Sequence, residues 1–222
     1  MTASSRPLIL EACVETIQQG LLAEKRHAGR IEFCQRLDLG GVTPDHDLIR
    51  TVIKKIKIPI KIMIRPRGGD FIYSDSEIDR MKSDIKYCKS IGVEEVVLGA
   101  LNNDGEVDYS ITQHLAKLAM PMKVTFHKAI DEVSNYMNAL KTLSTMQNID
   151  SVLSSGTKEN ALAGKEYIKI ASEEFSETLN IIAAGSITNT NLKEIHSELN
   201  IKEYHGKKIV GDLILKEYNK RR

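Results

Sequence analysis

The chain has 222 residues, of which 41% are hydrophobic and 27% charged, and its formal net charge is +1. This is ordinary globular composition, and we expect a single domain spanning residues 1–222. The balance of 31 basic against 30 acidic residues gives no electrostatic case for nucleic acid or a membrane surface as partner. No apolar run approaches the roughly 20 residues of a membrane span.

The cysteines and the N-terminus together predict a cytoplasmic protein. Three cysteines, an odd number, are scattered along the chain without a C-x-x-C pair. This usage is typical of a reducing compartment and argues against a disulfide framework or a structural zinc site. The opening M-T-A-S-S-R-P-L lacks the hydrophobic core of a signal peptide.

Short β-rich runs alternate with amphipathic segments eight times along the chain. The runs cover residues 8–13, 30–34, 59–65, 94–99, 123–127, 150–155, 180–185 and 201–205. Apolar residues between them recur at helical spacing. Three helix starts are indicated. Ser74 and Glu77 form a capping box, Asp108 can cap a helix, and Pro44 can occupy a first helical position. Because no glycine-rich phosphate loop follows the first run, we predict the α/β class and a closed (β/α)8 TIM barrel rather than a doubly wound sheet.

The first two strands end in similar ways, E-A-C and E-F-C. Strand residues alternate between the barrel interior and the helix layer, so a Glu and a Cys two positions apart share one face. We therefore expect Glu11, Cys13, Glu32 and Cys34 to face the interior at its upper rim, where barrel active sites are built. Buried, inert thiols remain an equally good interpretation of the two cysteines.

The same alternation turns polar residues of the third, fifth and eighth strands inward: Lys61, Arg65, Thr125, His127, Glu203 and His205. Buried charges are costly unless they are paired, so we expect an ion pair of Arg65 with Glu32 or Glu11. This concentration of charge predicts a ligand site at the mouth. His127 as a hydrogen-bonded core histidine is the alternative. Lys61 is expected to lie low in its strand, snorkelling or paired with Glu32, outside the site.

The stretch I-R-P-R-G-G-D-F-I-Y (64–73) is predicted to leave the third strand as a site loop. Pro66 has no N–H and ends the ladder, which frees Arg67 from the sheet. Gly68 lets the backbone turn close to a ligand, and Asp70 is expected to hold one of the arginines. Arg65 and Arg67 would bind a small anion.

Later loops carry glycine and hydroxyl groups at strand ends. Backbone N–H groups of such loops bind phosphate in many barrels. We accordingly expect substrate contacts at Ser155, Gly156, Gly185 and His205. Glycine at a strand end is also the ordinary way to turn a chain, so this signal is weak.

Taken together, these motifs resemble the CutC family, long labelled copper homeostasis proteins. The most specific match is R-P-R-G-G-D-F-x-Y-S (65–74), and the resemblance covers residues 8 to about 206. It extends to L-E-A-C (10–13), R-I-E-F-C (30–34), G-G-V-T-P (40–44), V-T-F-H-K-A-I-D (124–131), V-L-S-S-G (152–156) and A-A-G-S-I (183–187). The family fold is a (β/α)8 barrel, as the count of units predicts independently.

The resemblance implies a Cu(I) site at Cys13 and Cys34, because soft thiolates select Cu(I). Met63 or His127 would be a third ligand. The chain departs from the family after the eighth strand, which runs straight into H-G-K-K-I-V-G-D (205–212). Family members tend to carry a small-residue segment and a long loop there, so one wall of the mouth is expected to be reduced.

Three functions follow as hypotheses. The first is a cytosolic copper-binding protein. The second is an enzyme on a small anionic substrate, such as a phosphorylated one, with His127 as general acid/base and Glu11 or Glu32 setting its tautomer or acting as a second base. The third, a scaffold without chemistry, predicts a solidly packed mouth. A homodimer through exposed apolar residues at Leu21, Leu22 and Tyr87 is a further expectation.

Overall fold

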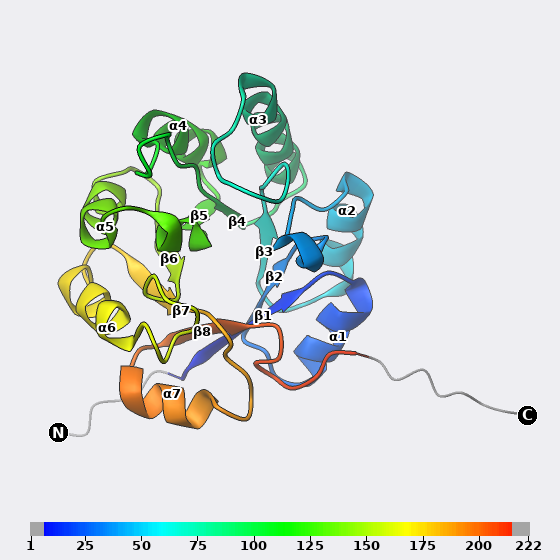
Figure 1. Ribbon diagram of the computed structural model, residues 1–222. Helices are drawn as coiled ribbons and strands as arrows, with labels where there is room; N and C mark the ends of the chain where they lie inside the picture. The colour runs from blue at the N-terminus through cyan, green and yellow to red at the C-terminus, as the bar shows by residue number, and fades with distance from the viewer. Residues whose placement is uncertain (1–6, 215–222) are drawn as a thin grey trace, which may run out of the picture.

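Eight parallel strands form a closed barrel in the computed structural model, which describes residues 7–214 (Figure 1). Each strand pairs with the next, and the last pairs with the first. The strands are β1 (Ile9–Val14), β2 (Arg30–Phe33), β3 (Ile60–Met63), β4 (Glu95–Leu98), β5 (Lys123–Phe126), β6 (Ser151–Ser154), β7 (Asn180–Ala183) and β8 (Glu203–Gly206). The predicted TIM-barrel class is thereby confirmed.

Helices surround the barrel as an outer ring (Figure 1). They are α1 (Ile17–Lys25), α2 (His46–Lys55), α3 (Asp75–Ser90), α4 (Tyr109–Ala119), α5 (Tyr136–Ser144), α6 (Lys165–Glu174) and α7 (Leu192–Leu199). Two 3-10 turns, η1 (Leu37–Leu39) and η2 (Lys128–Glu132), follow β2 and β5. No helix within residues 7–214 is long and apolar enough to cross a bilayer.

The predicted helix caps are tested directly by the backbone. The Ser74–Glu77 capping box and the Asp108 cap are both present. The prediction for Pro44 was wrong, because α2 begins at His46 with Asp45 as its N-cap. The backbone N–H and the carboxylate of Asp45 both bond the Gln35 side chain, which fixes the chain before the helix starts.

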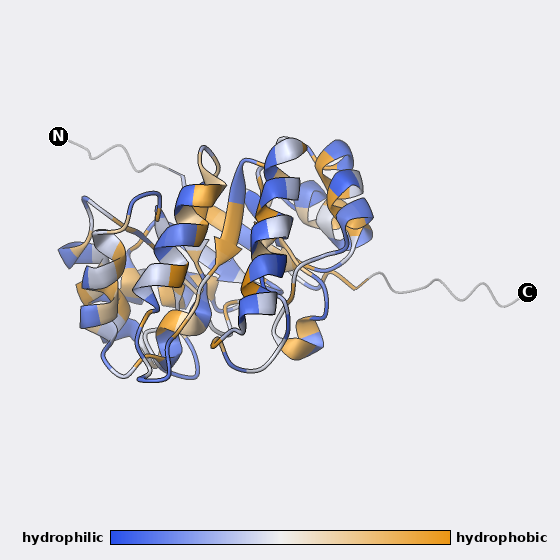
Figure 2. Ribbon diagram, turned by 90° about the horizontal axis from the view of Figure 1, so that it is seen from above, coloured by the Kyte–Doolittle hydropathy of each residue, from blue (hydrophilic) through white to orange (hydrophobic). Residues whose placement is uncertain are grey.

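The main hydrophobic core lies between the strands and the helix ring. Outward strand residues such as Phe33, Ile62 and Phe126 are fully buried there. Figure 2 shows the corresponding pattern, with a hydrophobic strand in the middle and helices that alternate hydrophilic and hydrophobic residues along their length. The alternation predicted for β3 is confirmed, since Ile62 belongs to this core whereas Met63 belongs to a separate small cluster with Cys13.

The segment after β8 fills the place that an eighth helix has in a complete strand–helix repeat. Within the described residues seven helices are present, and residues 207–214 run between α7 and α1 (Figure 1). Ile209 and Leu213 are buried in the main core, and Arg26 donates to the carbonyl of Asp212 at 2.6 Å. The chain thus closes the seam between its first and last helices without a helix. The N-terminal segment M-T-A-S-S-R-P-L, which was predicted to lack a signal peptide, lies mostly outside the described residues, because these begin at residue 7.

The surface residues considered for a homodimer differ in exposure. Leu21 is exposed, but Leu22 and Tyr87 are partly buried against the chain's own core. Tyr87 stacks on His46 at 3.7 Å between ring centroids and donates to the His46 carbonyl. Tyr87 is therefore not the free apolar surface that the sequence predicted.

Candidate functional site

A cavity of about 410 Å³ opens at the C-terminal ends of the strands. Its lining includes five of the predicted site residues, namely Cys13, Glu32, Arg65, His127 and His205. Larger hollows of about 620 and 930 Å³ lie at the N-terminal ends of strands and beside α6 and α7, and none of these five residues lines them. A solidly packed mouth, which the scaffold hypothesis requires, is not what the structure has.

Glu11 lies beneath the cavity in a network of buried charges. Its carboxylate accepts from Arg30 at 2.5 Å and lies 3.2 Å from the Lys61 ammonium and 2.7 Å from Nδ1 of His205. Burial alone would raise the pKa of this carboxyl, but Lys61, the hydrogen bond from His205 and Arg30 together hold the pKa well below its usual value. A carboxylate paired this way is a poor proton acceptor, so the contacts favour a positioning role for Glu11.

The predicted behaviour of Lys61 was partly wrong. Its side chain is fully buried and does not snorkel, and its partners are Glu11 and Glu95 rather than Glu32. Thr125 accepts from the same ammonium at 2.7 Å and donates to Glu95. Lys61 therefore belongs to the polar interior below the cavity, outside the site as expected.

His205 connects this interior network to the cavity. Glu11 and His205 are direct neighbours in the pairing of β1 with β8, which fixes the Nδ1 contact. Burial would lower the pKa of the imidazole, but the charge of Glu32 and hydrogen bonds with Cys13 and Glu11 raise the pKa well above its usual value. The contact with Glu11 leaves Nε2 as the ring nitrogen available to a ligand.

Cys13, Glu32 and His205 form a compact group of donor atoms. One atom from each side chain lies within 4.8 Å of the others, and all three residues are buried. Cys13 and Glu32 are register partners, with Sγ 3.5 Å from one carboxylate oxygen. The second oxygen of Glu32 is buried without a partner. Burial, as the largest cause, raises the pKa of the Glu32 carboxyl.

The two predicted thiols lie together. Cys13 Sγ and Cys34 Sγ are 3.9 Å apart, and both are free and buried. The hydrogen bond between the thiols, followed by burial, raises the pKa of Cys13 well above its usual value. Met63 packs in the same cluster. The pair is therefore positioned to share one soft ligand.

The predicted ion pair of Arg65 with Glu32 or Glu11 was wrong. Arg65 donates instead to the backbone carbonyls of Leu39, Gly41 and Gly69, and its guanidinium lies 4.6 Å from the Phe71 ring centroid. The turn after β2 and the loop after β3 close over the side chain and present carbonyls to it. Nε of Arg65 is buried without a partner.

His127 lines the cavity beside Phe71, with ring centroids 4.8 Å apart. Its Nδ1 accepts from the Ala129 N–H and caps η2, so a neutral ring carries its proton on Nε2. Burial, followed by the charge of Arg65, lowers the pKa of His127 to about 3. Nε2 is buried without a partner. These features suit a hydrogen-bond donor better than the acid/base role considered from the sequence.

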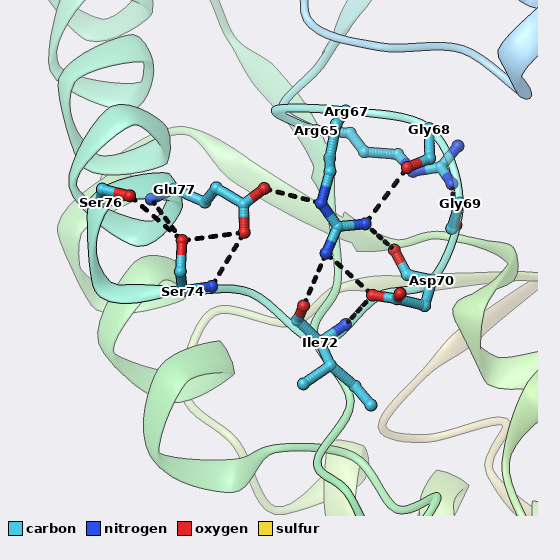
Figure 3. A network of polar contacts seen from close by, with 9 residues as sticks. All are labelled: Arg65, Arg67, Gly68, Gly69, Asp70, Ile72, Ser74, Ser76 and Glu77. Carbon is cyan, nitrogen blue, oxygen red and sulfur yellow. Dashed lines mark hydrogen bonds and ion pairs between the residues drawn. The ribbon is translucent and has the colours of Figure 1, made fainter.

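Arg67, Gly68 and Asp70 lie beside the cavity rather than in its lining. Arg67 pairs with Glu77 at 2.6 Å and with Asp70 at 2.9 Å, and it donates to the Ile72 carbonyl. Figure 3 shows these contacts. The expectation that Asp70 holds an arginine is confirmed. A Cβ on Gly68 would lie 2.8 Å from the side chain of Leu39. These residues shape the loop that delivers Arg65.

The first N–H groups of the loop after β6, those of Ser155, Gly156 and Thr157, are bonded within the chain rather than free for an anion. The carboxylate of Asp131 accepts from the backbone N–H of Ser155 and Thr157 and from the Ser155 hydroxyl. Gly156 donates to Ser154, and Gly185 packs against Ser155 with a φ of 99°. The expected anion contacts at Ser155, Gly156 and Gly185 are thus taken by the chain itself or serve packing.

Sequence reasoning missed several residues around the site. Arg30 and Glu95 complete the ion pairs, and Lys128 reaches the cavity from η2. The signal for Arg30 was available, since R-I-E-F places its apolar residues outward and its charged residues inward. Asp131 ends the motif V-T-F-H-K-A-I-D, but its role as acceptor for the loop after β6 had no local signal, because Ser154, Ser155 and Thr157 are 23 or more residues away along the chain.

The family model for the CutC family matches residues 8–210. The copper homeostasis protein cutC homologs of Mus musculus and Homo sapiens are each 40% identical over 197 residues, covering 89% of this chain and 72% of theirs. A solved CutC structure from Streptococcus agalactiae superposes with a TM-score of 0.85 at 27% identity, covering 91% of this chain and 99% of that one. An oxaloacetate acetylhydrolase, at a TM-score of 0.63 and 10% identity, covering 90% of this chain and 75% of that one, shares the fold alone.

Proposed function

The chain belongs to the CutC family, and from this premise we propose that it acts in copper homeostasis in the cytoplasm by binding Cu(I) through Cys13 and Cys34. The relatives that bear copper homeostasis in their names motivate the general role. The observation that carries the site is the approach of the two buried thiols to 3.9 Å. Free cysteines suit a reducing compartment.

Soft thiolate sulfur selects Cu(I) over harder metal ions. Met63 lies in the apolar cluster of both cysteines, so its thioether is favoured over His127 as a third donor. Nδ1 of His127 is already occupied by the Ala129 N–H. Because the pKa of Cys13 is raised, metal binding must displace its proton, and Cu(I) affinity is expected to rise with pH.

Anaerobic Cu(I) titration against a competing chelator tests this function. We expect one Cu(I) per chain and at least about tenfold weaker binding in Cys13→Ala and Cys34→Ala, since losses of this size follow even the removal of outer-shell groups. Cys88→Ala is the matched control, because Cys88 is an equally buried thiol on α3. Unchanged affinity and stoichiometry in the variant lacking both Cys13 and Cys34 would refute the proposal.

A second candidate, an enzyme on a small anionic substrate, is favoured by a separate observation. Nε of Arg65 and Nε2 of His127 are both buried donors without partners, and both residues line the cavity. Buried polar groups are rarely left unsatisfied, so two unpartnered donors on residues that line one cavity support an acceptor bound in that cavity. The His205 imidazole, oriented by Glu11, would supply the proton transfer.

Thermal unfolding in oxalate and in inorganic phosphate, at matched ionic strength, tests this anion site. At least one of the two anions should raise the Tm of the wild-type chain. Arg65→Lys keeps the charge but removes the Nε donor, and should abolish the rise. Arg36→Lys, at an exposed arginine paired with Asp38, is the control and should retain it. The candidate would be contradicted if Arg65→Lys and Arg36→Lys showed the same anion-dependent rise in Tm, or if neither anion raised the Tm of the wild-type chain.

A further inference from the structure

Three buried side chains with different donor atoms meet at the cavity: a sulfur, a carboxylate oxygen and an imidazole nitrogen. They come from β1, β2 and β8, which are consecutive around the closed barrel. Cys13 and Glu32 are register partners, and His205 is the partner of Glu11, two residues before Cys13. The group is therefore held by hydrogen-bonded strands rather than by loops, which fixes its spacing.

The spacing suits a single ion. The donor atoms of Cys13, Glu32 and His205 lie within 4.8 Å of one another. A zinc-class ion forms bonds of about 2.0–2.3 Å, so the widest pair would have to approach by roughly 1 Å. Rotation of the side chains supplies such a movement, with Glu32 as the residue whose free oxygen has no competing contact.

Glu32 provides an independent sign that a cation belongs there. The residue is 2% exposed, and one carboxylate oxygen has no hydrogen-bond partner. A buried carboxylate without a partner is costly unless a cation or a proton satisfies it. Neither Arg30 nor Lys61 pairs with it, since Arg30 is bonded to Glu11 and Glu203 and Lys61 to Glu11 and Glu95. The remaining neighbouring base, His205, is bonded at Nδ1 to Glu11.

His205 is oriented as a metal ligand would be. Its Nδ1 lies 2.7 Å from the Glu11 carboxylate, which fixes the ring and leaves Nε2 available. A carboxylate behind a histidine is the common outer-shell arrangement in metalloproteins, where it sets the tautomer and raises ligand basicity. Glu11 is itself held by Arg30 and Lys61, so the outer shell extends into the interior network.

We propose that Cys13, Glu32 and His205 form a site for a divalent metal ion of the zinc class. The thiolate and the carboxylate supply two negative charges, which balance the two positive charges of the ion, and the imidazole binds as a neutral donor. This mixed S, O and N donor set suits a borderline divalent ion better than Cu(I). Three protein ligands leave a fourth position facing the cavity, as in catalytic zinc sites. The ion would lie in the cavity whose lining carries the unpartnered donors of Arg65 and His127.

This site goes beyond the copper proposal and uses a different donor set. Both include Cys13, but the divalent site requires Glu32 and His205, whereas the Cu(I) site requires Cys34. The two proposals therefore fail separately. Loss of Cu(I) binding in Cys34→Ser leaves the divalent site untouched, and loss of divalent binding in Glu32→Gln leaves the Cu(I) pair untouched.

Titration of the full chain with Co²⁺, under reducing and anaerobic conditions, tests the divalent site. We expect one Co²⁺ per chain, displaceable by Zn²⁺, with a thiolate-to-cobalt charge-transfer absorption. Cys13→Ser should lose that absorption. Glu32→Gln and His205→Asn should each weaken binding at least about tenfold. Asn is chosen because its amide can still contact Glu11. Cys88→Ser, at a buried thiol on α3, is the matched control and should bind within about threefold of wild type. Cys34→Ser separates this site from the thiol pair, because it should still bind Co²⁺.

Circular dichroism of each variant shows whether it is folded, and Glu32→Gln, which removes an unpartnered buried charge, decides the question if His205→Asn unfolds. The proposal is overturned if the folded wild-type chain binds no stoichiometric Co²⁺ or Zn²⁺, or if binding lacks the charge-transfer absorption. It is equally overturned if binding survives Glu32→Gln and disappears in Cys34→Ser, because the ion would then lie between the two thiols.

Discussion

At the scale of single residues, the surroundings shift the pKa values of two buried histidines at one cavity in opposite directions. His127 accepts a backbone N–H at Nδ1 and lies near Arg65, and burial is the largest cause of its pKa of about 3. His205 faces the carboxylates of Glu11 and Glu32, which outweigh burial and raise its pKa. Residue type and strand-end position are the same for both, so the difference in pKa comes from the groups that each ring faces: Arg65 near His127, and Glu11 and Glu32 near His205.

Stability should record the low pKa of His127. An unfolded histidine titrates near pH 6.5, and the folded value is about 3. Between these values the unfolded chain binds more protons, so the free energy of unfolding falls as the pH drops below about 6.5. One such group contributes up to about 1.4 kcal/mol per pH unit.

Urea unfolding between pH 7.5 and 5 checks this expectation. In His127→Gln the free energy of unfolding should fall less steeply with decreasing pH than in the wild type, whatever its absolute level. His114→Gln, at an exposed helical position, should keep the wild-type slope. If His127→Gln and wild type run parallel, His127 is protonated in the folded chain and the donor role assigned to it is wrong.

At the scale of elements, the loop after β6 is organised by a side chain from η2. Asp131 accepts from Ser154, Ser155 and Thr157 and pairs with the Lys128 ammonium at 2.7 Å. A hydroxyl- and glycine-rich loop has the appearance of a phosphate-binding segment in the sequence. The N–H groups of Ser155 and Thr157 already bond the Asp131 carboxylate. They therefore join this loop to η2 instead of binding a phosphate.

Asp131→Asn should therefore destabilise the fold. The amide keeps one acceptor but places N–H groups against the donors of Ser155 and Lys128. Hydrogen bonds to charged groups contribute about 1.5–3 kcal/mol, and we expect a loss of about 2 kcal/mol in the free energy of unfolding by urea. Asp104→Asn, at an exposed loop position, should change stability by less than about 0.5 kcal/mol. Equal stability of the two variants would show that Asp131 does not hold the loop.

The elements themselves were predictable because their signals are local. The alternation in β2 and β3 correctly placed Glu32 and Met63 inside and Ile62 outside. The partners of the inward charges were not predictable, since ring closure brings β8 beside β1 and supplies His205 to Glu11 from 194 residues away. Arg65 shows the same limit, because backbone carbonyls delivered by two loops satisfy it and carry no sequence signature.

At the scale of the whole molecule, a belt of buried and partly buried polar side chains, five of them charged, joins six of the eight strands below the cavity. Arg30 of β2 bridges Glu11 of β1 and Glu203 of β8. Lys61 of β3 continues the belt to Glu95 of β4, and Thr125 of β5 bonds both residues of that pair. The belt is both the floor of the site and the part of the interior that replaces an apolar core. Its integrity is therefore tied to closure of the barrel.

Removing Lys61 should weaken the whole barrel. Lys61→Met keeps the apolar volume but leaves the buried Glu11 and the partly buried Glu95 with one cation fewer. Breaking a buried pair costs about 3–5 kcal/mol, and we expect a loss of this size in a single cooperative unfolding transition. Lys82→Met, which removes the exposed pair with Asp79, should cost less than about 1 kcal/mol.

Acid unfolding gives a second measurement of the same variant. The pKa of Glu11 is held below its usual value, and Lys61 is the largest of the causes that lower it. The stability that Glu11 contributes is present above the unfolded pKa of about 4.3 and is lost as the pH falls through the folded value. Without Lys61 the folded pKa rises, so the acid midpoint of Lys61→Met should move to higher pH, while that of Lys82→Met stays at the wild-type value. A wild-type acid midpoint in Lys61→Met would mean that Arg30 and His205 alone keep Glu11 ionised, and that the belt does not depend on its buried lysine.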